Sequence, residues 1–131
     1  MNASFWRWWG PLVLYMAFIF FVSSRSRPAT FDETPDVALH GGAYFLMALL
    51  AVRALTRGLR EPASRRALFG GLAIAVAYGV SDEWHQSWVP ERVGSWLDVA
   101  YDGGGALLAG VALSLFWYVR RLQVIRWISR I

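Results

Sequence analysis

The chain has 131 residues and a net charge of +4, a length that accommodates one domain and not two. Apolar residues make up 56% of the sequence, which contains eight Trp, and this composition indicates a membrane protein. The absence of Cys excludes disulfide bonds and thiolate chemistry. The arginines flank apolar runs instead of forming a basic module, which argues against a nucleic-acid partner.

Four apolar segments are each close to the ~20 residues that a helix needs to cross the ~30 Å hydrocarbon core of a bilayer. Trp and Tyr gather near their ends, as at a membrane interface. The first segment could instead be a cleaved signal peptide, but the residues after it lack an Ala-x-Ala cleavage site. We therefore predict one all-α domain over residues 1–131, an antiparallel bundle of four transmembrane helices. The predicted spans are residues 5–24, 36–55, 67–83 and 98–119.

The arginines divide unequally between the two sides of this predicted bundle. Three lie on one side, namely Arg25, Arg27 and Arg92, and ten lie on the other, near both termini and in the loop after the second span. Because cytoplasmic loops are enriched in Lys and Arg, we predict that both termini are cytoplasmic and that the chain resides in the cytoplasmic (inner) membrane. The tail at residues 120–131 suits either an interfacial helix attracted to anionic lipids or an extension of the fourth span.

Polar residues recur at helical intervals at the start of the second span. Asp36, His40 and Tyr44 are four residues apart, so they lie on one face of a helix. The carboxylate could fix the tautomer of the histidine, or share a substrate or a metal ion with it. It could also complement the dipole at the helix N-terminus, with His40 hydrogen-bonded to a neighbouring helix.

A second polar group stands at the end of the third span. Glu83 and Gln86 are three residues apart there, although the dipole at a helix C-terminus disfavours a carboxylate. Glu83 therefore either has a cationic partner or is solvated in a loop. Arg92, which follows the turn at Pro90, is the nearest candidate partner.

A third polar group begins the fourth span, where Asp98 and Asp102 share one helical face. The dipole at a helix N-terminus favours negative charge, but two carboxylates this close repel each other. Either one of them holds a proton or a cation lies between them, and Arg92 could supply that cation through a bidentate contact. Three glycines follow at 103–105, which permits close helix packing or a locally unwound turn.

Antiparallel packing would bring these three helix ends together on the non-cytoplasmic side of the membrane. We therefore predict an outward-facing polar pocket as the binding site and assign no catalytic residue. We expect no metal ion and no cofactor, because the sequence contains no HxxxH or HExxH pair. The predicted pocket residues are Asp36, His40, Tyr44, Glu83, Gln86, Arg92, Asp98 and Asp102.

The order and spacing of these residues resemble the signature of the VanZ-like family over roughly residues 11–119. The motifs are Glu83-x-x-Gln86, Pro90-x-Arg92, Asp98-x-x-x-Asp102 with Gly105 after it, and Asp36-x-x-x-His40-x-x-x-Tyr44 upstream. The resemblance implies a small multi-pass membrane protein, and the family's namesake is linked to low-level resistance to the glycopeptide teicoplanin. One departure is that the family usually has Asn at the position of Asp102, where Asp adds a charge beside Asp98.

Three functions are compatible with these features. The first is an envelope protein whose pocket binds a lipid-linked cell-wall intermediate or a glycopeptide, with Arg92 meeting an anionic group. The second is a membrane enzyme that acts on a lipid-linked substrate, with Glu83 or His40 as general base. The third is a proton-coupled transporter, for which four spans would require an oligomer. The polar residues could also form a purely structural network, and membrane lipids are partners in every case.

Overall fold

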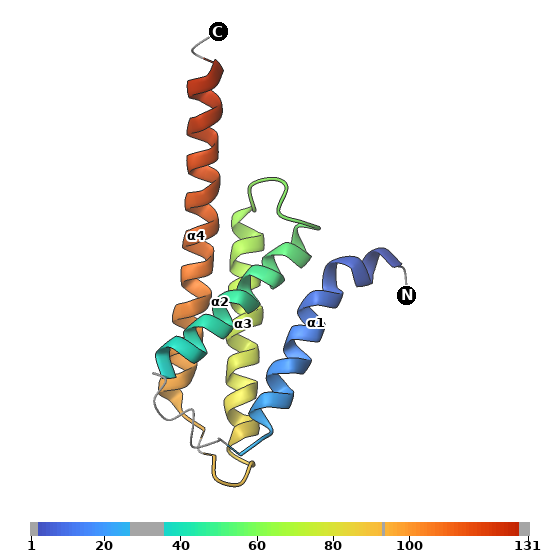
Figure 1. Cartoon of the computed structure of the whole chain (residues 1–131), viewed down its shortest axis with the longest axis vertical. Coiled ribbons are helices and arrows are strands. Elements are labelled where there is room, and N and C mark those ends of the chain that lie inside the picture. Colours follow the sequence, from blue (N-terminus) through green and yellow to red (C-terminus); the bar gives the residue numbers. More distant parts are fainter. Residues whose placement is uncertain (1–2, 27–35, 93, 129–131) are drawn as a thin grey trace.

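The computed structural model describes residues 3–26, 36–92 and 94–128, with the side chain of Asp36 excepted. Their regular structure is entirely α-helical (Figure 1). The helices are α1 (Ala3–Ser23), α2 (Asp36–Leu55), α3 (Arg65–Gln86) and α4 (Trp96–Ile128).

Three of these helices, α1, α2 and α4, are long and apolar enough to cross a membrane. These helices indicate a membrane protein. Large apolar side chains exposed on the surface, such as Leu14 and Leu108, agree with this conclusion. The third predicted span differs, because α3 does not qualify among the helices that the structure describes. Its sequence explains this result: α3 is rich in Gly and Ala, starts with two arginines and ends with Asp82 and Glu83 close to its last residue.

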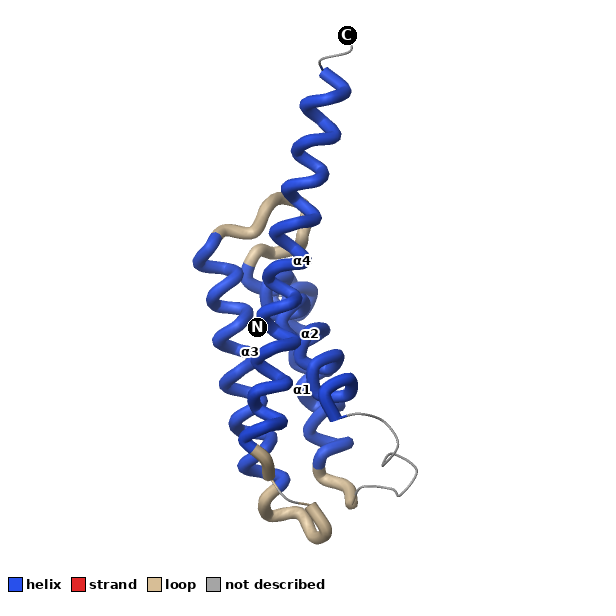
Figure 2. The backbone as a smooth tube through the Cα atoms, turned by 90° about the vertical axis from the view of Figure 1, so that its left-hand side faces the viewer, coloured by secondary structure: helices blue, strands red, loops and turns tan. Residues whose placement is uncertain are grey.

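Successive helices run in alternating directions, so the start of α1, the α2–α3 connection and the end of α4 lie at one end of the bundle (Figure 1). The ends of α1 and α3 and the starts of α2 and α4 lie at the other end. Helix α2 contacts each of the other three helices and crosses the bundle obliquely. Helix α4 continues without a break to Ile128 and projects beyond its neighbours (Figure 2). Through Ile128, the tail is therefore an extension of the fourth helix, one of the two arrangements predicted for it.

Local sequence signals fix the helix ends. Helix α2 ends in a Schellman motif, in which Arg57 adopts a left-handed conformation (φ 52°) and Gly58 donates its N–H to the Arg53 carbonyl at 2.8 Å. Ser64 caps the start of α3 by accepting the Ala67 N–H. Helix α4 begins after Ser95, whose hydroxyl accepts the Leu97 N–H at 3.2 Å.

A proline inside α1 shows how a neighbouring helix satisfies the backbone in an apolar region. Pro11 has no N–H, so the carbonyl of Arg7, four residues earlier, loses its helical donor. The guanidinium of Arg53 on α2 donates to this carbonyl at 3.4 Å and to the Trp8 carbonyl at 3.1 Å. Arg53 thereby supplies the hydrogen bond that Pro11 cannot make and attaches α1 to α2.

The core consists mainly of small side chains where α2 meets α3 and α4. Ala48, Ala51, Ala75, Ala106 and Ala109 are buried there beside the larger Leu12, Tyr44 and Met47. Small residues allow the helix backbones to approach closely, which favours van der Waals packing between helices in a membrane. The tight packing of α2 against α4 brings their polar residues together at the end of the bundle where both helices begin.

Candidate functional site

Polar side chains converge at the end of the bundle where α1 and α3 end and α2 and α4 begin. They come from three helices, and four of them are almost completely buried. Polar groups buried to this extent require internal hydrogen bonds or bound partners. We call this group the polar site, and its members are His40, Asp82, Glu83, Gln86, Asp98 and Asp102.

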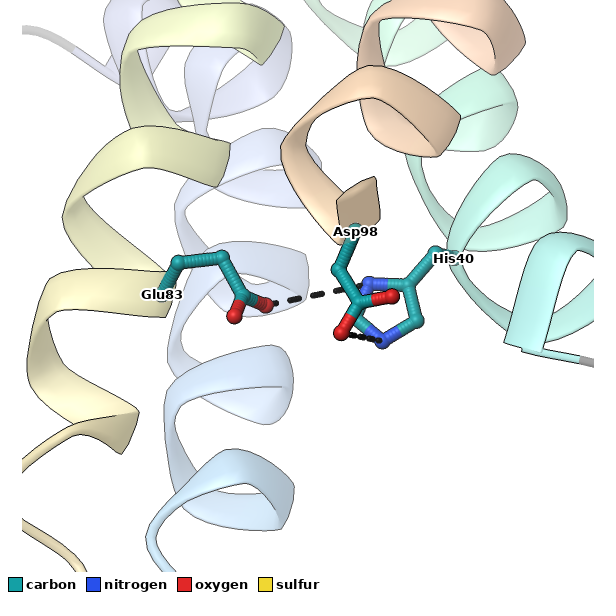
Figure 3. Close-up of side chains that lie close together, drawn as sticks. All are labelled: His40, Glu83 and Asp98. Carbon is teal, nitrogen blue, oxygen red and sulfur yellow. Dashed lines mark ion pairs between the residues drawn. The ribbon is translucent and has the colours of Figure 1, made fainter. Parts of the chain in front are cut away.

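His40 lies at the centre of the polar site. Its Nδ1 lies 3.0 Å from Oδ1 of Asp102 and 3.9 Å from Oε1 of Glu83. Its Nε2 lies 3.9 Å from Oδ2 of Asp98, so carboxylates from α3 and α4 approach both ring nitrogens (Figure 3). An ionised carboxylate can only accept a hydrogen bond, so the Asp102 contact places a hydrogen on Nδ1 and turns Nε2 toward Asp98.

Glu83 is held by groups that surround the end of α3. Its Oε2 accepts the Ser95 backbone N–H at 2.8 Å, and its Oε1 accepts from Nε2 of Gln86 at 3.2 Å. The loop between α3 and α4 folds back tightly to make this contact, since a side chain at Gly94 would lie 2.5 Å from the Glu83 carbonyl oxygen. The residue that caps α4 therefore also orients the carboxylate at the end of α3.

Asp82 connects the polar site to α1. Its Oδ1 accepts a 2.6 Å hydrogen bond from the Ser23 hydroxyl, and its Oδ2 accepts from Gln86 Nε2 at 3.1 Å. The Gln86 side-chain oxygen in turn accepts from Nη1 of Arg92 at 3.1 Å, while Arg92 Nε donates to the Arg25 carbonyl at 3.1 Å. Helix α1, which lacks a charged residue at this end, joins the site through one serine.

Two buried oxygen atoms in this region have no hydrogen-bond partner among the described residues: Oδ2 of Asp102 and the hydroxyl of Tyr44. Both side chains flank Gly79 on α3, because a Cβ built there would lie 2.7 Å from Asp102 Oδ2 and 3.2 Å from Tyr44 Cε1. Tyr44 therefore extends the polar site toward the middle of the bundle.

A contact between two glycines sets the distance between α2 and α4. A side chain on Gly105 would overlap the backbone of Gly41, the residue after His40. Gly103 and Gly104 have more space, with a nearest neighbour at 3.8 Å for the first and none within 4 Å for the second. All three glycines are helical, so they serve close packing at one position and do not form an unwound turn.

The structure changes several of the contacts that the sequence led us to expect. Arg92 was the expected partner of Glu83, Asp98 and Asp102, but in the described part of the chain it bonds to Gln86 and to a carbonyl instead. The group between the two aspartates is His40. The physical reason is that Arg92 extends toward the end of α1, whereas His40 projects from the helix packed directly against α4.

For three other residues, the sequence-based prediction cannot be compared with the structure or did not identify the role that the structure gives them. The expected contact of Asp36 with His40 concerns a side chain outside the described residues. His85 faces α1, where it stacks on Phe20 at 4.5 Å and contacts the Ser24 hydroxyl at 3.0 Å. Sequence reasoning did not assign Asp82 to the site, although its spacing of four residues from Gln86 was a usable signal.

Among the residues that the structure describes, the charges of the polar site do not balance. Carboxylates of Glu83, Asp98 and Asp102 approach one imidazole, and a fourth, from Asp82, is linked to Glu83 through Gln86. In the described part of the chain, Arg92 reaches them only through Gln86. Carboxylates that share a site cannot all stay ionised without a compensating charge. Protons, a metal ion or a cationic ligand group can supply that charge. His40 and Asp98 are 19% and 18% exposed and are the members through which such a species can enter.

A separate apolar cavity of about 510 Å³ lies between α2, α3 and α4. Its lining includes Phe69, Leu107 and Leu115, with Arg65 and Tyr118 as polar contributors. None of the polar-site residues lines it. The cavity is therefore separate from the polar site at the end of the bundle.

Comparison of the chain with protein-family models, curated proteins and solved structures gave no match.

Proposed function

We propose that this chain is an envelope protein of the VanZ-like type, and that its polar site binds the head group of a lipid-linked cell-wall intermediate or a glycopeptide. The observation that carries the proposal is the convergence of His40, Glu83, Asp98 and Asp102 from three helices at one end of the bundle. Burying so many ionisable groups is costly unless they have a function or a partner.

The proposal includes four membrane crossings. Helices α2 and α4 both start at the polar site and run the same way, so the segment between them must return across the membrane. Helix α3 has 22 residues, about 33 Å of helix, which is enough for one crossing. Helix α3 can cross the membrane despite its modest hydropathy, because α1, α2 and α4 all pack against it and cover part of its surface.

The polar site then faces the outside of the cell. Nine of the arginines that the structure describes, near the start of α1, around the α2–α3 connection and in the last part of α4, lie toward the opposite end of the bundle from this site. The positive-inside rule assigns that arginine-rich end to the cytoplasm. Both termini are cytoplasmic in this arrangement, and the polar site opens toward envelope components.

The chemistry of the polar site favours a ligand that carries a cationic or donor group and also an anionic group. Its carboxylates suit ammonium, amide N–H or hydroxyl groups, which are donors. Arg92 and the exposed Arg25, whose carbonyl it contacts, suit a phosphate or carboxylate at the rim. Lipid-linked cell-wall intermediates carry phosphate next to sugar and peptide donors, and glycopeptides carry ammonium and amide groups.

Two substitutions test this function. We expect Glu83→Gln and Arg92→Ala to reduce the retention of lipid-linked cell-wall intermediates by the purified protein and to abolish any effect of the chain on teicoplanin susceptibility. Glu61→Gln and Arg60→Ala are matched controls, because both residues are exposed in the connection at the other end of the bundle. Wild-type retention and susceptibility in both site variants, with correct membrane insertion, would refute the proposal.

One observation favours catalysis as a second candidate function. The Asp102–His40 hydrogen bond of 3.0 Å orients the imidazole as carboxylates orient general bases in many enzymes. In that case the same site would cleave or transfer a group on a lipid-linked substrate. Incubation with radiolabelled envelope lipids separates the two functions, since binding alone leaves the lipids unchanged and catalysis yields a new product that His40→Gln does not form.

A further inference from the structure

We propose that His40, Glu83 and Asp98 bind a divalent transition-metal ion of the Zn²⁺ type, and that Asp102 positions His40 for this purpose. The ion would occupy the polar site to which the function above is assigned, but the inference stands on the geometry of these side chains alone. It also differs from the sequence-based expectation of no metal, which rested on the absence of two histidines at metal-binding spacing.

The three residues already present suitable atoms to one point in space. One ligand atom from each of His40, Glu83 and Asp98 lies within 4.8 Å of the other two (Figure 3). Oδ2 of Asp98 lies 3.9 Å from Nε2 of His40, and Oε1 of Glu83 lies 3.9 Å from Nδ1, the other ring nitrogen. Zn²⁺ binds nitrogen and oxygen at about 2.0–2.2 Å, so ligand atoms around it are about 3.3 Å apart in a tetrahedron. Small rotations of the two carboxylate side chains therefore suffice to complete the set.

Asp102 provides the support that a metal-binding histidine commonly has. A ligating imidazole usually donates its second ring N–H to a carboxylate, which fixes the tautomer and makes the other nitrogen a better ligand. Here Nδ1 of His40 contacts Asp102 Oδ1 at 3.0 Å, and Nε2 faces Asp98. The ring is thus oriented with its free nitrogen toward a second ligand. Asp102 is fully buried, so this arrangement is rigid.

A second observation points independently to a bound species. Within the described residues, the Tyr44 hydroxyl and Asp102 Oδ2 are buried without a hydrogen-bond partner. Tyr44 is 2% exposed, and its ring lies beside Gly79 together with the Asp102 carboxylate. Buried polar atoms of this kind usually have partners. A metal ion with three protein ligands keeps a coordination position for water, which can serve as donor and acceptor at such a site.

The composition of the site selects the class of ion. An imidazole favours Zn²⁺ and its first-row neighbours, whereas Mg²⁺ and Ca²⁺ prefer sites made of oxygen alone. The two carboxylate ligands neutralise the charge of the ion, and Glu83 stays anchored because Ser95 holds its other oxygen at 2.8 Å. A proton on His40 would offset only one of the four carboxylate charges.

Isothermal titration of the detergent-purified, untagged and chelator-stripped chain with ZnCl₂ tests the inference. We expect one Zn²⁺ per chain, and no displacement by a large excess of MgCl₂. Asp98→Asn should weaken binding at least 100-fold, because it removes a direct ligand. Asp102→Asn, which installs the residue usual in VanZ-like proteins, should keep the stoichiometry and weaken binding about 10–100-fold, the effect typical of an outer partner. Glu61→Gln is the control with unchanged affinity.

Two results would overturn the inference: no Zn²⁺ binding by the wild-type chain, or equal binding by wild type and Asp98→Asn. Asp98 is partly exposed, and within the described residues its carboxylate lies 3.9 Å from its ion-pair partner His40. Its Asn variant should therefore retain the helical circular-dichroism spectrum, which is recorded alongside. The titration contains no envelope lipid, so its failure is distinguishable from failure of the proposed function. A chain that binds Zn²⁺ but retains no lipid-linked intermediate contradicts the function alone.

Discussion

Because Gly105 packs directly against Gly41, we expect that adding one methyl group at Gly105 will lower the stability of the fold and disrupt the polar site. In Gly105→Ala the new Cβ would overlap the carbonyl oxygen, the carbonyl carbon and the Cα of Gly41. These are backbone atoms, so no side-chain rotation relieves the overlap and α2 must move away from α4. A shift of about 1 Å takes the 3.0 Å contact between His40 and Asp102 beyond hydrogen-bond range.

The size of the effect follows from opposing contributions. Replacing Gly by Ala inside a helix stabilises it by roughly 0.5–1 kcal/mol. Overpacking that shifts a backbone typically costs about 1–3 kcal/mol. The loss of a hydrogen bond to a charged group costs a further ~1.5–3 kcal/mol in water-soluble proteins. In membranes, the loss of a hydrogen bond costs about 0.6 kcal/mol on average. The overlap is with backbone atoms, so we take the upper part of the overpacking range and expect Gly105→Ala to be destabilised by about 2 kcal/mol.

Unfolding in mixed detergent micelles, followed by the fluorescence of the eight Trp residues, measures this difference. Gly104→Ala is the matched control, because nothing lies within 4 Å of a Cβ at that position, and it should be neutral or slightly more stable than wild type. Gly41→Ala tests the direction of the contact. Its Cβ would lie 3.7 Å from the Tyr101 carbonyl oxygen, an ordinary separation, so it should be tolerated. Equal stability of Gly105→Ala and Gly104→Ala would refute the reasoning.

Two further substitutions test how α1 is attached. Tyr78→Phe removes the 2.6 Å hydrogen bond to the Met16 carbonyl and should lower the free energy of unfolding by about 0.6–1.5 kcal/mol; no loss in the same unfolding assay would mean that this bond contributes nothing. Ser23→Ala leaves Asp82 with Gln86 as its remaining donor among the described residues and should cost about 1–3 kcal/mol. Ser23→Thr, which keeps the hydroxyl, should recover most of this loss, and an Ala variant as stable as the Thr variant would contradict the prediction.

The helices themselves were predictable from local sequence. Runs of about twenty apolar residues require helical backbone in a membrane, because each N–H and C=O must be satisfied within its own segment. The predicted spans at 5–24 and 36–55 agree with α1 and α2 to within a few residues. The third was located correctly as a helix, yet its Gly, Ala and charged residues make its apolar character weaker than that of the other three.

The sequence indicated which helix ends carry polar residues, but it did not single out Asp82 and did not indicate the contacts. Helical spacing and the antiparallel order indicated that Glu83, Asp98, Asp102 and His40 would meet, since these properties depend on the chain alone. The partner of each group depends on which faces of two helices touch. If one helix were rotated about its axis by one residue, the polar groups would have other partners. The close contact of Gly41 with Gly105 decides that rotation, and with it the choice of His40 over Arg92 as the centre of the polar site.

The amino-acid order thus determined which segments are helical and which helix ends carry charge, because hydrophobicity and helix periodicity act within one segment. Tertiary packing alone decided that an imidazole from α2 lies between carboxylates of α3 and α4, and that Ser23 of α1 bonds to Asp82. These contacts join residues between 43 and 59 positions apart. They exist because small side chains let the helix backbones approach closely enough for polar groups at their ends to meet.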